Sequence, residues 1–181
     1  MKFLWICLVL AFFFALNTWG LSLEYRTCGA PADAVPLYRL FNSRSGSVDH
    51  WYTPDAAAVT DAVPKGYAFE NVLGLVFLTQ EEGTAPLYHV VSASATDNLY
   101  TMNLTEVGLD EANGYASVPN PPTLYIYATQ VCGSVPVYRL YSAAGTDSFY
   151  TTSEAERLQF IANDGYTDLG IMGYVLPLGC S

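Results

Sequence analysis

Apolar and aromatic positions recur along this chain in three stretches that resemble one another. They are VPLYRLF from Val35, APLYHVV from Ala85 and VPVYRLY from Val135. Each begins beside a proline, which cannot donate to a sheet ladder, and continues with β-branched and aromatic residues, as an edge-entered strand does. Each stretch therefore predicts a β-strand, and the period of about 50 residues predicts a repeat protein.

A second short segment follows each predicted strand, after a run of Ser, Gly, Ala and Thr. These segments are DHWYT (Asp49–Thr53), DNLYT (Asp97–Thr101) and DSFYT (Asp147–Thr151). Small and polar residues between two strand-forming segments favour a turn. The sequence therefore predicts a β-hairpin in each repeat.

Helix-start signals come directly after the hairpins. Asp55, Asn103 and Ser153 occupy equivalent positions, and all three are good N-cap residues. Glu106 and Glu156 stand three residues further on, which predicts capping boxes. Each hairpin is therefore expected to lead into a helix.

Each predicted helix ends before a Gly-Tyr pair, at Gly66, Gly114 and Gly165. A glycine at this place favours the left-handed exit from a helix. An apolar stretch then closes each unit: GLVFL from Gly74, TLYIY from Thr123 and GIMGYVL from Gly170. The order strand, strand, helix, strand is thus expected three times.

The predicted fold is α+β, with three strand-strand-helix-strand repeats around a pseudo-threefold axis in one compact domain. A β-trefoil is the alternative, since its period is similar, but it needs a strand where helices are predicted. The repeats cover about 35–84, 85–134 and 135–180, and are called repeats 1, 2 and 3. The domain is expected to span residues 21–181.

The first 20 residues have the pattern of a secretory signal. Lys2 precedes an uncharged apolar run from Phe3 to Leu16, which is too short to span a membrane comfortably. Thr18 and Gly20 are small residues where a signal peptidase cuts. Residues 1–20 are therefore expected to be removed, and the product to be secreted and extracellular.

The charge balance argues against several partners. The chain carries 7 Lys and Arg against 17 Asp and Glu, a formal net charge of −10. Such acidity disfavours nucleic acid and anionic membranes as partners. The chain is expected to be a monomer without cofactors, and a metal site is not expected because two His and no close pair of Cys are present.

The cysteines leave the disulfide pattern open. Cys7 belongs to the expected signal, so Cys28, Cys132 and Cys180 remain, an odd number for an oxidising compartment. A closed repeat array brings its ends together, which favours Cys28–Cys180. Cys28–Cys132 is the alternative, because both residues begin a similar Cys-Gly lead-in before a repeat.

The segments PLYRL, TDSFYTT with SEAER, DGY and GIMGYV resemble a tandem-repeat family of unknown function found in secreted fungal and bacterial extracellular proteins. The resemblance covers residues 28–180. Repeat 2 departs from the pattern, with His89 in place of the strand arginine and Asn98-Leu99 in place of His-Phe. The resemblance implies the repeat fold and no catalytic residues, and its extracellular setting suggests polysaccharide or cell-wall binding by association.

The recurrence of Asp in all three hairpins indicates a structural part that each repeat needs. An arginine–carboxylate pair across each hairpin would fix its register. The predicted pairs are Arg39 with Asp49, His89 with Asp97, and Arg139 with Asp147. A structural role is predicted for these six residues.

The residues between each Asp and Thr differ among the repeats, as binding surfaces on a shared scaffold do. The predicted ligand-binding residues are His50, Trp51, Tyr52, Asn98, Tyr100, Ser148, Phe149 and Tyr150. Aromatic groups beside carboxylates or amides are typical of carbohydrate binding, and three weak sites would gain avidity on a polymer.

The sequence lacks the nucleophile-elbow, zinc-protease and P-loop motifs, so no catalytic residue is predicted. A non-catalytic carbohydrate- or wall-binding module is the main hypothesis. A secreted protein-binding or inhibitor protein is the alternative, and a glycan-active hydrolase is a second one, because paired carboxylates have no fixed spacing in a sequence. Asn103–Thr105 (NLT) is an N-glycosylation sequon.

Overall fold

The computed structural model describes residues 28–43, 48–92, 94, 96–118 and 124–179. The expected signal, residues 1–20, lies outside the described residues, and so does Cys180. Within the described part of the chain, no helix is both long and apolar enough to cross a membrane.

The described part of the chain is mostly β-strand with three short α-helices, compatible with the α+β class. In chain order the elements are β1 (Ala34–Asn42), β2 (Asp49–Thr53), α1 (Ala56–Ala62), β3 (Ala68–Phe77), β4 (Thr84–Ser92), β5 (Asp97–Thr101), α2 (Leu104–Ala112), β6 (Ala116–Ser117), β7 (Leu124–Tyr127), β8 (Val135–Ser142), β9 (Asp147–Thr151), α3 (Glu154–Asn163) and β10 (Thr167–Val175). A helix follows each hairpin at the place where a β-trefoil would need a strand.

The three hairpins β1–β2, β4–β5 and β8–β9 are present and share one register. Tyr38 lies opposite Thr53, Tyr88 opposite Thr101, and Tyr138 opposite Thr151. Each hairpin therefore places equivalent sequence positions at equivalent points of the ladder.

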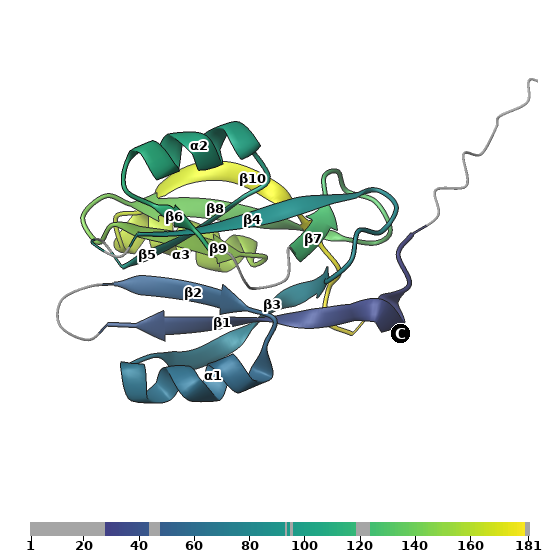
Figure 1. Cartoon of the computed structure of the whole chain (residues 1–181), viewed down its shortest axis with the longest axis horizontal. Helices are drawn as coiled ribbons and strands as arrows, with labels where there is room; N and C mark the ends of the chain where they lie inside the picture. The colour runs from purple at the N-terminus through teal and green to yellow at the C-terminus, as the bar shows by residue number, and fades with distance from the viewer. Residues whose placement is uncertain (1–27, 44–47, 93, 95, 119–123, 180–181) are drawn as a thin grey trace, which may run out of the picture.

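The predicted N-caps are confirmed. Asp55 and Asn103 accept hydrogen bonds from the backbone N–H groups of residues two positions on, and Ser153 accepts one from Glu156. Each helix contacts the hairpin that precedes it, and α1 and α2 lie at opposite edges of the molecule in Figure 1. Each helix thus covers the hairpin that precedes it in the chain and leaves the inner face of the strands free to pack.

Closing strands join the hairpins into one antiparallel sheet, in the order β2-β1-β3-β7-β10-β8-β9. In repeat 2 the closing strand is divided into β6 and β7, both of which pair with β4. β7 also pairs with β3 and β10, so it links the strands of all three repeats.

The main core is built from all three repeats. Leu37, Leu87 and Val137, at equivalent positions of the first strand of each hairpin, are buried together with Tyr52, Tyr100, Tyr150 and residues of the closing strands. Smaller apolar clusters lie beneath α2, around Leu99 and Val107, and beneath α3, around Phe149 and Tyr166. Burial of these apolar surfaces is the main force that holds the units together.

The disulfide joins Cys28 to Cys132, with 5.8 Å between their Cα atoms. The favoured pairing Cys28–Cys180 is therefore wrong, and the alternative is the one formed. The physical reason is that the two Cys-Gly lead-ins to repeats 1 and 3 lie side by side, next to the cluster of Phe77, Tyr127 and Leu176.

Candidate functional site

Three tyrosines at equivalent positions lock the hairpins to one another. The Tyr52 hydroxyl donates to the Tyr150 carbonyl (2.8 Å) and accepts from the Tyr150 N–H (2.8 Å). Tyr150 makes the same two bonds to the Tyr100 backbone, and Tyr100 makes them to the Tyr52 backbone. The three rings meet edge to face, with centroids 5.4 to 5.7 Å apart. These contacts form a closed cycle at the centre of the molecule.

The three hairpin aspartates form a second cycle of contacts. Asp147 accepts from the backbone N–H and Nδ1 of His50, each at 2.7 Å. Asp49 accepts from Asn98 Nδ2 at 3.0 and 3.1 Å. Asp97 accepts from the N–H and hydroxyl of Ser148, at 2.7 and 3.2 Å. Each aspartate therefore binds the residue that follows the aspartate of another repeat.

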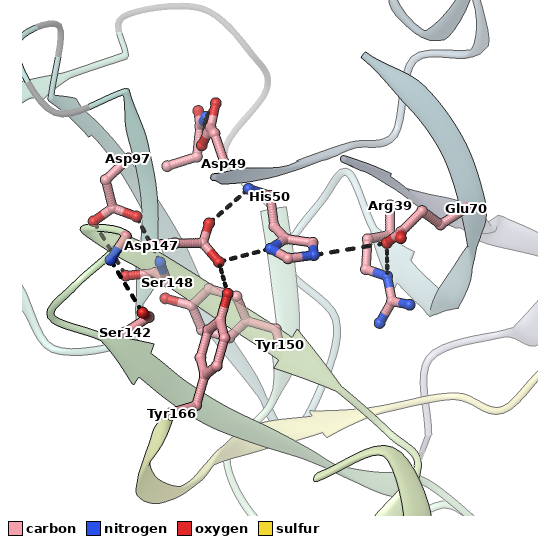
Figure 2. Close-up of polar contacts among 12 residues, drawn as sticks. Arg39, Asp49, His50, Glu70, Asp97, Ser142, Asp147, Ser148, Tyr150 and Tyr166 are labelled. Carbon is pink, nitrogen blue, oxygen red and sulfur yellow. Dashed lines mark hydrogen bonds and ion pairs between the residues drawn. The ribbon is translucent and has the colours of Figure 1, made fainter. Parts of the chain in front are cut away.

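The Gly-Tyr markers complete this arrangement. Tyr67, Tyr115 and Tyr166 each donate a hydroxyl hydrogen bond to the aspartate of their own repeat. Figure 2 shows Asp147 held between His50 and Tyr166, and Glu70 between His50 and Arg39. The recurring Asp and Gly-Tyr positions thus serve the packing of repeats against one another.

Burial raises the pKa of Asp49 to about 6, against the opposing effect of the hydrogen bonds from Tyr67 and Asn98. The neighbouring charges of Asp147 and Asp97 act in the same direction as burial. Burial also raises the pKa of Asp97. The aspartate cluster therefore carries an electrostatic cost at neutral pH.

The predicted pairs across the hairpins are wrong. Arg39 lies opposite Tyr52, and the residue opposite Asp49 is Asn42. The same register places Arg139 opposite Tyr150, and His89 opposite Tyr100. The aspartates take donors from other repeats instead, so Asp97 and Asp147 do not depend on His89 and Arg139.

The strand arginines pair with helix glutamates of another repeat. Arg39 of repeat 1 donates to both carboxylate oxygens of Glu156 in repeat 3, at 2.9 and 2.7 Å. Arg139 of repeat 3 donates to Glu106 of repeat 2 at 2.7 Å. We call these contacts junction 3–1 and junction 2–3.

Threonines at the end of each hairpin take part in these two junctions. Thr101 donates its hydroxyl to Glu106 (2.5 Å), and Thr151 donates to Glu156. Glu106 and Glu156 therefore do not use their side chains in the predicted capping boxes. Each carboxylate instead bridges a threonine hydroxyl of its own repeat and an arginine of another.

Junction 1–2 has lost both members of this ion pair. Its arginine position is His89 and its glutamate position is Ala58, by the spacing that relates Arg39 and Arg139 to Glu156 and Glu106. A cavity of about 430 Å³ opens here. It is lined by Trp51, Tyr52, Thr53, Pro54, Asp55, Ala58, Leu87, Tyr88, His89, Tyr100, Ser117, Val118 and Leu124.

The equivalent place at junction 2–3 is a smaller cavity of about 300 Å³. Thr101, Asn103, Glu106 and Arg139 line it, at the positions that correspond to Thr53, Asp55, Ala58 and His89. The Arg139–Glu106 pair occupies the centre of that junction, whereas at junction 1–2 short side chains leave the space open.

His89 is held as a neutral imidazole with one defined tautomer. Its ring stacks on Tyr100 at 4.3 Å between centroids, and burial lowers the pKa of His89 to about 4, against the hydrogen bond to Asn98. Asn98 Nδ2 donates to the Asp49 carboxylate, so Asn98 Oδ1 faces His89 Nε2 at 2.8 Å. Nε2 therefore carries the proton, and Nδ1 keeps a lone pair.

A third cavity, of about 560 Å³, lies between repeats 1 and 3 and is lined by His50, Glu70, Phe160 and neighbouring residues. His50 is buried and bound to Asp147 there. Asn98 and Ser148 serve the other two aspartates in the same way. The role of His50 is therefore shared by all three repeats and does not mark this cavity as special.

The structure buries seven of the eight residues predicted to bind ligand: His50, Tyr52, Asn98, Tyr100, Ser148, Phe149 and Tyr150. These seven side chains therefore do not form an exposed binding surface, because the polar groups of six of them serve contacts between repeats and Phe149 packs beneath α3. Trp51 is half-buried and lines the cavity at junction 1–2, as Tyr52 and Tyr100 do.

Thr53, Asp55, Ala58 and Tyr88 also line this cavity and were missed as site residues by sequence reasoning. The signal that could have found the site is the joint departure of His89 and Ala58 from the Arg and Glu of the other repeats. Within the described ranges, no group of three or more His, Cys, Asp or Glu side chains is arranged to hold a metal ion.

The chain belongs to a family described as a domain of unknown function (DUF5648), which matches residues 14–119 and 120–176. No curated protein and no solved structure matches the chain. The family places the sequence among related domains and assigns no activity to the cavity at junction 1–2.

Proposed function

We propose that this protein is a secreted, non-catalytic module that binds a glycan or cell-wall polysaccharide in the cavity at junction 1–2. The observation that carries the proposal is the local loss of the Arg–Glu pair, which leaves an aromatic and polar cavity. Ligand sites are typically clefts of roughly 300–1,000 Å³ that combine aromatic walls with a few polar groups. The cavity, at about 430 Å³, falls in that range.

The cavity lining suits a sugar ring. Trp51 and Tyr88 supply aromatic surface, and Thr53, Asp55, His89 and Ser117 supply polar groups. The equivalents of Trp51, namely Leu99 and Phe149, are buried beneath their own helices. Trp51 alone of the three is half-buried and available at a cavity wall, where an indole offers a large stacking face.

The pseudo-threefold arrangement is part of the proposal. The cycles of tyrosine and aspartate contacts run in the same order through repeats 1, 3 and 2, which supports closure of three units around one axis. Among the three junctions in the described part of the chain, junction 1–2 alone lacks the Arg–Glu pair, so we propose one site per chain rather than three.

A glycan-active hydrolase is less well supported at this cavity. Glycoside hydrolysis uses two carboxyl groups on either side of the bond. Asp55 is the one carboxylate among the described lining residues, and it accepts the α1 N-cap hydrogen bond from Ala57. Binding without cleavage therefore fits the lining better.

The double variant Ala58→Glu/His89→Arg tests the site. It rebuilds at junction 1–2 the pair seen at the other two junctions, so the chain should fold with unchanged or greater stability while the cavity closes. Retention on an affinity gel containing β-glucan, xylan, mannan or chitin should be lost. Ala57→Glu is the control, since Ala57 is exposed on the same helix and does not line the cavity.

Failure of the purified protein to bind any of these polysaccharides would refute glycan binding. Retention unchanged in the double variant would refute this cavity as the site. A secreted inhibitor or other protein-binding protein is the alternative function. It would use an exposed surface and would keep its partner in the double variant.

A further inference from the structure

Thr53 retains an unused hydrogen-bond donor at the cavity. Its hydroxyl oxygen accepts from the Asp55 N–H at 3.2 Å, as the hydroxyls of Thr101 and Thr151 accept from the residues two positions on. Those two threonines also donate to Glu106 and Glu156. With Ala58 at the glutamate position, the Thr53 hydroxyl proton has no acceptor among the described residues.

His89 offers the complementary group. Asp49 fixes Asn98, Asn98 accepts from His89 Nε2, and Nδ1 is left as an acceptor without a partner in the described part of the chain. A nitrogen lone pair replaces the cationic N–H groups that Arg39 and Arg139 present at the other junctions. The polarity at this point is thereby reversed from donor to acceptor.

Thr53 and His89 line the same cavity, at the positions that one carboxylate bridges at junction 2–3. At junction 2–3 one carboxylate bridges Thr101 and Arg139, at 2.5 and 2.7 Å. The imidazole of His89 is shorter than a guanidinium, and the cavity is larger at junction 1–2 than at junction 2–3 (about 430 against about 300 Å³), which leaves room for a ligand group between the two side chains. A bridging group here must accept from Thr53 and donate to His89.

We propose that the site selects neutral sugars through one hydroxyl that accepts from Thr53 Oγ1 and donates to His89 Nδ1. This inference rests on the proposed function of the same cavity. A hydroxyl both donates and accepts, whereas an ionised carboxylate can only accept and would face the His89 lone pair and the nearby Asp55 carboxylate. Uronic acids and other anionic sugars are therefore excluded, and Thr53 and His89 determine specificity.

The test is calorimetric titration of the whole secreted chain with neutral hexasaccharides of glucose, xylose, mannose and N-acetylglucosamine, and with hexagalacturonate as the anionic probe. We expect one neutral probe to bind and hexagalacturonate to bind at least about tenfold more weakly. Thr53→Val and His89→Phe, which remove the donor and the acceptor, should each weaken the neutral probe about tenfold. Thr53→Ser should keep its affinity.

Thr101→Val is the matched control, because it removes the same hydroxyl at the closed junction and should leave affinity unchanged. Monodeoxy analogues of the bound sugar identify the hydroxyl. The analogue that lacks this hydroxyl should bind Thr53→Val and the wild type with the same affinity. His89→Phe gives an independent reading if Thr53→Val does not fold.

Three outcomes separate the two proposals. If no hexasaccharide binds, the proposed function fails. If a neutral probe binds but hexagalacturonate binds equally well, the neutral-sugar inference is overturned and the proposed function stands. The neutral-sugar inference is also overturned if Thr53→Val or His89→Phe binds the neutral probe as tightly as Thr101→Val does.

Discussion

Junctions 2–3 and 1–2 are built from hairpins of the same register, and they differ at both positions of the Arg–Glu pair. Arg139 and Glu106 form an ion pair at the first, beside a cavity of about 300 Å³, and His89 and Ala58 line a cavity of about 430 Å³ at the second. A lone Arg without its Glu would leave a partly buried charge unpaired, which is strongly destabilising. The absence of both partners together avoids that cost, so a larger cavity can exist at one junction while the fold is kept.

The largest expected effect separates Phe149 from Trp51, which occupy equivalent strand positions. Phe149 is fully buried and stacks on Phe160 at 4.0 Å, so Phe149→Ala should lower the free energy of unfolding by about 3–5 kcal/mol. Trp51 is half-buried, and Trp51→Ala should cost about 1–2 kcal/mol while reducing glycan affinity about tenfold. Urea denaturation and titration with the bound oligosaccharide measure the two effects. A Trp51→Ala variant with wild-type affinity would show that the indole does not contribute to ligand binding.

A second experiment places the Ala and His of junction 1–2 at the equivalent positions of junction 2–3. Glu106→Ala leaves Arg139, whose side chain is 13% exposed, without its partner, and should cost about 2–3 kcal/mol. The double variant Glu106→Ala/Arg139→His matches the residues of junction 1–2 and should be more stable than Glu106→Ala. Urea denaturation of the two variants and the wild type measures their free energies of unfolding and checks this order of stability. Equal or greater loss in the double variant would show that the two junctions are not interchangeable.

Local patterns were enough to predict the hairpins, the N-caps and the glycine exits, because each depends on neighbours along the chain. Gly66, Gly114 and Gly165 all have positive φ, as the Gly-Tyr markers predict. The partners of Asp49 and Arg39 could not be predicted in the same way. They come from other repeats, and the nearest opposite charge across a hairpin was a misleading guide.

Of the residues that line the cavity at junction 1–2, only Trp51, Tyr52 and Tyr100 are among those that the sequence predicts to bind ligand. The cavity depends on the short side chain of Ala58, and an alanine has no functional group that would mark it as a site residue in a single sequence. Comparing equivalent positions across all three repeats would have exposed the joint change at 58 and 89. The tautomer of His89 depends on Asn98 and Asp49, which are brought together by folding alone.

The third prediction concerns pH and contrasts His89 with Asp49. The pKa of His89 falls from 6.5 to about 4 on folding, so its contribution to stability is present above pH 6.5 and is lost as the pH falls toward 4. The pKa of Asp49 rises from 3.8 to about 6, so its contribution is present below pH 3.8 and is lost as the pH rises through 6. The two groups therefore oppose each other between about pH 4 and 6.

Removing the imidazole of His89 should reveal the pH dependence that Asp49 contributes to stability. His89→Gln should gain stability relative to the wild type on acidification, with a slope approaching about 1.4 kcal/mol per pH unit between pH 6.5 and 4. Thermal or urea unfolding of both proteins at several pH values measures the difference. Parallel curves would show that His89 is not held neutral in the folded chain.

The smallest expected effect compares two threonines that differ in one hydrogen bond. Thr101 and Thr53 both accept from the residue two positions on, but Thr101 also donates to Glu106. A hydrogen bond to a charged group contributes about 1.5 kcal/mol, and its loss leaves Glu106 with Arg139 as its remaining partner. Thr101→Val should therefore lower the free energy of unfolding by about 1–1.5 kcal/mol more than Thr53→Val does.

Saturating neutral oligosaccharide should narrow this difference between the two variants. Bound ligand stabilises the wild type and Thr101→Val more than Thr53→Val, whose site has lost its donor. Equal costs for the two variants without ligand would mean that the Thr53 hydroxyl already has an acceptor in the free protein, and the donor assigned to the sugar would then not be available.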